Sequence, residues 1–75
     1  MENDFEPMSV GFWTRVCEVT KERGMTQKEL AEKMGLKIRA MQTRFARKGN
    51  PELETIAMLS KILGVSYKFL IDGRD

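Results

Sequence analysis

A cluster of basic side chains lies in one short segment of the chain. Positions 37–48 carry Lys37, Arg39, Arg44, Arg47 and Lys48, and they hold no Asp or Glu. Such a cluster suits a polyanion, although most runs of charge are solvated helix faces, so charge alone leaves both interpretations open. The net charge of the chain is only +2, and the first seven residues hold three acids and no base. The excess positive charge therefore belongs to the remainder of the chain, around this segment.

Helical periodicity divides the same segment into two faces. At about 100° per residue, a helix with Met41 facing a core places Ile38 and Phe45 within about 60° of it. The opposite face then carries a guanidinium, an amide, a hydroxyl and a methyl group, from Arg39, Gln42, Thr43 and Ala46. Arg can donate twice to guanine, Gln can pair with adenine, and Thr or Ala can contact the thymine methyl group. An ordinary surface helix would mix Glu with Lys there, so the acid-free face favours contact with base edges.

Glycines mark the ends of the elements that position this segment. Each of Gly24, Gly35, Gly49, Gly64 and Gly73 closes a helical pattern, because glycine adopts the left-handed conformation that ends a helix. The expected helices run from about Ser9 or Val10 to Arg23, from Thr26 to Gly35, from Lys37 to Lys48, from Asn50-Pro51 to Gly64, and from Ser66 through Leu70. No stretch shows the alternation of a strand. The sequence predicts an all-α, compact five-helix bundle.

Helix-start signals and apolar stripes support these elements. Thr26 and Glu29 have the spacing of a capping box, whereas Asn50 can cap the fourth helix and Pro51 suits its first position. The residues expected to face the core are Phe12, Val16, Val19, Leu30, Ala31, Met34, Leu53, Ile56, Leu59, Ser60 and Leu63, with Trp13 and Cys17 beside the first stripe. Both Phe69 and Leu70 belong to the last helix.

The residue census excludes several kinds of chemistry. The chain has no His and one Cys, Cys17, so a His-dependent triad, a disulfide within the chain and a structural zinc site are excluded. We interpret Cys17 as a packing residue. No apolar run approaches the ~20 residues of a membrane-spanning helix, and no secretion signal is recognisable. We therefore expect a cytoplasmic protein that is not an enzyme and binds no metal, cofactor or membrane.

The residues Thr26 to Lys48 form a helix-turn-helix pattern, since a capped helix is followed by Gly35-Leu36 and a second helix. The sequence GMTQKELAEKMGL, from Gly24 to Leu36, resembles the core of the Cro/CI-type (XRE-like) family, which includes phage repressors. Pro51 to Ile56 and Leu63 to Ser66 resemble the fourth helix of that family and its turn into the fifth. The resemblance implies a lambda repressor-like DNA-binding domain whose third helix lies in the major groove.

The resemblance also implies roles for particular positions. Phosphate contacts are implied for Thr26 and Gln27 at the start of the second helix and for Arg47 and Lys48 after the third. Base-facing positions are Lys37, Ile38, Arg39 and Thr43, with Gln42 alongside. Periodicity instead places Ile38 near the edge of the core, so its contact with DNA stays open. Arg44 replaces a frequent aromatic residue, and either a phosphate or a partner within the protein could hold it. Lys37 replaces a capping Ser or Thr, which costs ~1 kcal/mol.

These observations predict a sequence-specific transcriptional regulator, a repressor that occupies a double-stranded operator as a homodimer with half-sites about 10 bp apart. The dimer patch would comprise Met58, Ile62, Tyr67 and Ile71, although these are equally interpreted as scattered surface hydrophobes. The alternative is a protein-interaction module, such as an antitoxin-like component, that binds through Trp13, Tyr67 or Ile71. We divide the chain into a flexible acidic tail (1–8), a DNA-binding domain (9–73) and an end (74–75), and a longer protein could contain it.

Overall fold

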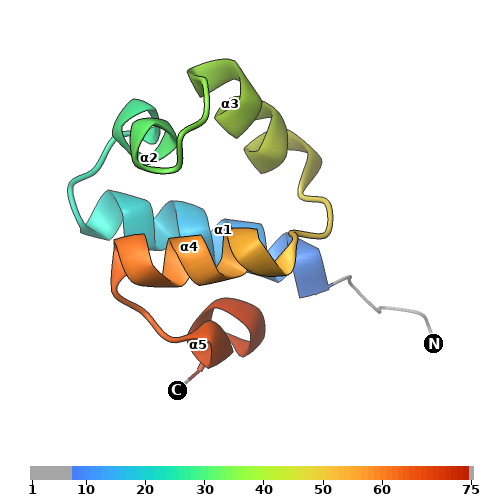
Figure 1. Cartoon of the computed structure of the whole chain (residues 1–75). Helices are drawn as coiled ribbons and strands as arrows, with labels where there is room; N and C mark the ends of the chain where they lie inside the picture. Colours follow the sequence, from blue (N-terminus) through green and yellow to red (C-terminus); the bar gives the residue numbers. More distant parts are fainter. Residues whose placement is uncertain (1–7, 75) are drawn as a thin grey trace.

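The computed structural model describes residues 8–74. Five helices occupy them: α1 (Met8–Glu22), α2 (Gln27–Lys33), α3 (Ile38–Arg47), α4 (Leu53–Leu63) and α5 (Tyr67–Asp72). Helices α1 and α4 lie across the middle, with α2 and α3 on one side and α5 on the other (Figure 1). The described residues contain no strand, so the predicted all-helical bundle is confirmed. Within them, no helix is both long and apolar enough to cross a membrane.

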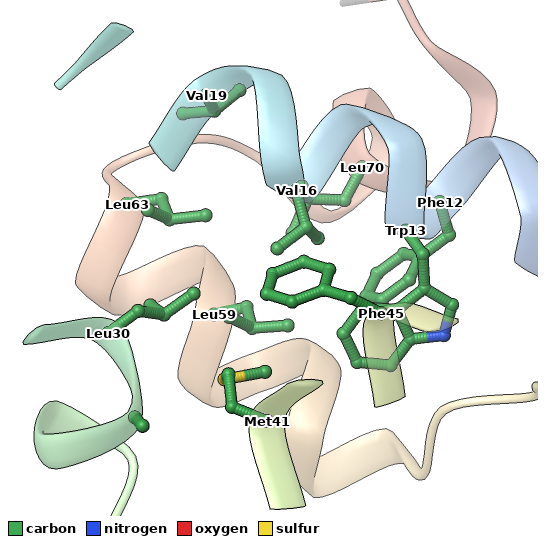
Figure 2. Close-up of a cluster of buried hydrophobic side chains, with 11 residues drawn as sticks. Phe12, Trp13, Val16, Val19, Leu30, Met41, Phe45, Leu59, Leu63 and Leu70 are labelled. Carbon is green, nitrogen blue, oxygen red and sulfur yellow. The ribbon is translucent and has the colours of Figure 1, made fainter. Parts of the chain in front are cut away.

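The core lies where α1 meets the other four helices. It consists of Phe12, Trp13, Val16, Val19, Leu30, Ala31, Met41, Phe45, Leu59, Leu63 and Leu70. Figure 2 shows Phe45 of α3 reaching into the cluster toward Val16 and Trp13. The Phe45 ring meets the Trp13 ring edge to face, with 5.7 Å between centroids. Such pairs add about 0.5–1.5 kcal/mol beyond the burial of their area. The predicted stripes of α1 and α2 are confirmed, with Met34 and Cys17 packed at the margin.

Left-handed glycines end four of the helices as predicted. Positive φ angles occur at Gly24, Gly35, Gly64 and Gly73. The expectation for Gly49 is wrong, because Lys48 takes the left-handed position with φ 50°. A lysine tolerates this strained conformation here because its ammonium donates to the Phe45 carbonyl oxygen, 2.9 Å away, in the last turn of α3.

Helix α4 begins later than predicted. Its N-cap is Glu52 and its first helical residue is Leu53, so Asn50 and Pro51 belong to the preceding loop. Leu53 is 83% exposed, which contradicts its predicted place in the core. At about 100° per residue it lies about 120° from Leu59 around the helix, outside the arc that faces the core. Thr55 occupies that arc instead, one turn before Leu59.

Arg15 in α1 and Arg23 just after it join this helix to helices that are distant in sequence. The Arg15 guanidinium donates to the carbonyl oxygens of Leu70 (2.9 Å) and Ile71 (2.6 Å), and Arg23 Nε donates to that of Leu63 (3.0 Å). A cation at these positions neutralises the carbonyls left without partners at a helix C-terminus. Helices α4 and α5 are thereby attached to α1. Of the predicted tail, Met8 is the first residue of α1, and residues 1–7 lie outside the described part.

Candidate nucleic-acid interface

Helix α2 begins with a complete capping box. Thr26 Oγ1 accepts from the Glu29 backbone N–H (3.1 Å), and the Thr26 N–H donates to Glu29 Oε1 (2.8 Å), as predicted. The backbone N–H and then the hydroxyl of Thr26 hold the pKa of the Glu29 carboxyl below its ordinary value of 4.5. Because both ends of the box are satisfied, the first turn of α2 is ordered and its Gln27 is presented at the surface.

Helix α3 depends on tertiary contacts more than on local signals. Its N-cap, Lys37, makes no side-chain capping hydrogen bond, which agrees with the expected loss of a cap. Its buried residues are Met41 and Phe45, which lie one turn apart on the inner side. Ile38 is half-buried beside them, as the periodicity predicts. Two core anchors on successive turns define which face of α3 points outward.

The outer face of α3 is open and free of acidic groups. All four predicted outward residues are exposed: Arg39, Gln42, Thr43 and Ala46. The Thr43 hydroxyl donates to the Arg39 carbonyl oxygen at 2.9 Å. In that geometry the Thr43 oxygen keeps its capacity to accept a hydrogen bond, and the side-chain methyl group is available for apolar contact. The face therefore offers cationic donors, an amide, an acceptor and methyl groups.

Trp13 fixes the C-terminal end of α3. The ring is 1% exposed, and its Nε1–H donates to the Gly49 carbonyl oxygen at 2.7 Å. Together with the edge contact on Phe45, this hydrogen bond holds α1 to both α3 and the loop that follows it. The alternative hypothesis that Trp13 contacts a protein partner is wrong, because the side chain lies in the core.

The two arginines on the flank of α3 border a hollow. It is lined by Trp13, Ala40, Thr43, Arg44, Arg47, Gly49 and Asn50. Arg44 is half-buried and Arg47 is exposed. A hollow lined by two arginines and by residues of the loop after α3 has the charge and the donors that suit a phosphate group.

A second hollow lies at the start of α2. It brings together Thr26 and Gln27 with Cys17, Thr20, Lys21, Met25 and Phe45. Lys21 is exposed in the last turn of α1, and sequence reasoning missed it as a neighbour of Gln27. The turn between α1 and α2 brings the two residues together, and hydrogen bonds from the Gly24 and Met25 N–H groups to the Lys21 and Thr20 carbonyl oxygens close that turn. Lys21 is thus a further cation beside the predicted positions Thr26 and Gln27.

The four apolar residues of the predicted dimer patch do not form one group. Met58 and Tyr67 are 42% and 56% exposed and line one hollow. Ile71 lines a different hollow with Phe12 and Ile56, and half-buried Ile62 packs against the core. Within residues 8–74 there is also no group of three or more side chains suited to a metal ion.

The family comparison agrees with this geometry. A family model described as helix-turn-helix matches residues 18–70, more than half of the chain. The matched range includes all of α2, α3 and α4 and extends into α5. Comparisons with curated proteins and with solved structures gave no match. The chain therefore belongs to the Cro/CI-type (XRE-like) helix-turn-helix family of DNA-binding regulators.

Proposed function

We propose that this protein is a sequence-specific transcriptional repressor, located in the cytoplasm, that occupies a double-stranded DNA operator. The observation that carries the proposal is the exposed, acid-free outer face of α3, formed by Arg39, Gln42, Thr43 and Ala46. These four side chains supply the donors, acceptor and methyl groups that read base edges in the major groove. Occupancy of DNA by such a helix requires no reaction, cofactor or metal.

Phosphate contacts orient α3 on the duplex. We assign them to Thr26, Gln27, Arg44, Arg47 and Lys48, and we add Lys21, while Lys37 and Ile38 stay among the base-facing positions that the resemblance implies. Four of these residues, Lys21, Arg44, Arg47 and Lys48, are cations, and neutralising phosphates releases counterions from DNA. Lys48 has a second role in the free protein, where its ammonium holds the Phe45 carbonyl oxygen. Binding should therefore weaken steeply with salt, with a slope of about −0.9 for each phosphate neutralised.

A single domain offers few base contacts, so we propose that a homodimer binds two half-sites about one turn of DNA apart. Exposed apolar residues of α4 and α5, Met58 and Tyr67, support this second part of the proposal. Ile62 packs against the core and Ile71 lines another hollow, so the exposed part of the predicted patch is reduced to Met58 and Tyr67.

Selection of duplexes from a random pool tests the proposal directly. We expect enrichment of one sequence with two-fold symmetry. Arg39→Ala should cost ~1–3 kcal/mol on the selected duplex and relax the preference at one position, because a bidentate contact with a base is lost. Lys33→Ala, at an exposed position of α2, is the matched control and should leave preference unchanged. An unselective pool, or an Arg39→Ala protein with unchanged affinity and preference, would refute the assignment of the reading face.

A further inference from the structure

The outward face of α4 carries a charge pattern that is complementary to itself. Glu54, Ala57, Met58 and Lys61 line one shallow hollow together with Ser60 and Tyr67. At about 100° per residue, the four α4 residues of this group fall within about 100° of arc. The arc lies opposite the buried residues Thr55, Leu59 and Leu63, and in Figure 1 no described helix covers the front of α4.

Along the sequence, these residues are arranged symmetrically about the midpoint between Ala57 and Met58. Glu54 and Lys61 lie at equal distances on either side of that midpoint, with opposite charges. When two copies of α4 pack antiparallel about a two-fold axis at this point, Glu54 of each copy faces Lys61 of the other. The axis also places Ala57 of each copy opposite Met58 of the other. An isologous interface requires this reciprocity, in which residue i contacts j and j contacts i.

We propose that a second copy of this chain docks on the α4 face, with the two helices antiparallel and the register centred between Ala57 and Met58. The proposal rests on the proposed function in one respect, since it names the surface through which the homodimer forms. Ala57 is small enough to permit helix axes about 8–10 Å apart. Met58 and Tyr67, which are 42% and 56% exposed in the single chain, then bury apolar surface that is otherwise in contact with water.

The charges distinguish a second copy from other partners. A DNA duplex or an acidic peptide would bind best to a surface that carries only positive charge, and a basic peptide to a surface that carries only negative charge. This face has one acid and one base at symmetric positions, so its net charge is zero. A copy of the same face offers the complementary pattern. One helix with one flanking tyrosine buries less than the ~1,200–2,000 Å² of a standard interface, so we expect a weak, concentration-dependent dimer.

Charge exchange tests the register. Glu54→Lys places two like-charged pairs in the homodimer, and so does Lys61→Glu. Each single variant should raise the dimer dissociation constant by about tenfold, because two attractive pairs become repulsive. An equimolar mixture of the two variants forms heterodimers in which both pairs are again opposite in sign, as does the homodimer of the double variant. Both should regain the wild-type dissociation constant.

Sedimentation velocity over a concentration series measures these constants. Glu18→Lys and Lys33→Glu make the same charge changes at exposed positions of α1 and α2 and should leave both the dimer and DNA binding unchanged. Circular dichroism confirms that each variant is folded. Single variants that dimerise like the wild type, or a mixture as weak as its components, would overturn the pairing.

A gel shift with a mixed-sequence duplex pool, run on the same proteins, separates the two proposals. Retained DNA binding with an unperturbed dimer in the single variants counts against the α4 register alone. A wild type that is monomeric at every soluble concentration also overturns the register, whether or not it shifts DNA. Failure of the folded wild-type protein to bind any duplex counts against the proposed function.

Discussion

Replacing Trp13 with phenylalanine separates the hydrogen bond to Gly49 from the aromatic packing around it. The variant keeps a ring in the core but loses the Nε1–H that donates to the Gly49 carbonyl oxygen. Gly49 is exposed, so water can hydrate the released carbonyl, and the lost bond should cost about 0.5–1.5 kcal/mol. The smaller ring adds ~1 kcal/mol for the volume it leaves unfilled.

A loss of ~2 kcal/mol is large for this protein but should not unfold it. A domain of this length has a free energy of unfolding of about 4–11 kcal/mol. Trp13→Ala would lose about 3–5 kcal/mol and is a poorer choice for binding studies. Urea unfolding followed by far-UV circular dichroism measures the change, since Trp13 is the sole tryptophan and its fluorescence disappears with the substitution.

The functional part of the prediction needs a control of similar stability. Val19→Ala removes a buried side chain from the same helix, near its end and away from Gly49. If the Trp13 hydrogen bond holds the loop after α3 in place, Trp13→Phe should weaken binding to the selected duplex more than Val19→Ala does. Our reasoning would be refuted by a Trp13→Phe protein that is as stable as the wild type. Equal losses of DNA affinity in the two variants would refute the positioning role.

Three further predictions concern stability. Arg15→Ala should lower the free energy of unfolding by about 2 kcal/mol, since two charge-assisted hydrogen bonds to α5 are lost; an unchanged melting temperature would contradict this. The lowered pKa of the Glu29 carboxyl means that its contribution to stability is complete above the unfolded-state value of 4.5 and is lost as the pH falls below it. Acid titrations of Glu29→Gln should therefore lack this component, and an unaltered profile would exclude it. Leu59→Ala should cost ~2–5 kcal/mol in urea unfolding, whereas exposed Leu53→Ala should stay within ~0.5 kcal/mol, and equal costs would disprove the assigned helix phase.

Local signals explain the elements that could be predicted from the sequence. The Thr26–Glu29 box depends on residues three apart and is formed as expected. Met41 and Phe45 are buried while Arg39, Gln42 and Thr43 are exposed, because a helix with two apolar residues on successive turns has only one orientation against a core. The geometry of the candidate reading face therefore follows from periodicity within α3.

Long-range contacts explain what could not be predicted. Asn50 and Pro51 have the properties of a helix start, but Trp13 holds the adjacent Gly49 carbonyl, and α4 begins only at Leu53. The sequence pattern places Leu53 in the core, whereas in the structure Leu53 is the exposed first residue of α4. The hydrogen bonds of Arg15 join residues 55 and 56 positions apart, and nothing in the local sequence indicates them.

The two sides of α3 have separate roles, packing on the inner side and proposed DNA contact on the outer side. Attachment to the protein depends on Met41, Phe45 and the end of the helix, where Lys48 and Trp13 satisfy backbone carbonyls. The outward side chains are exposed, and their substitution should alter stability by no more than ~0.5 kcal/mol. Because stability and base contact depend on different residues, the outer face can change without disturbing the fold that aims it. For this reason a loss of DNA preference on substituting Arg39, with stability unchanged, has one physical meaning: a contact with a base has been removed.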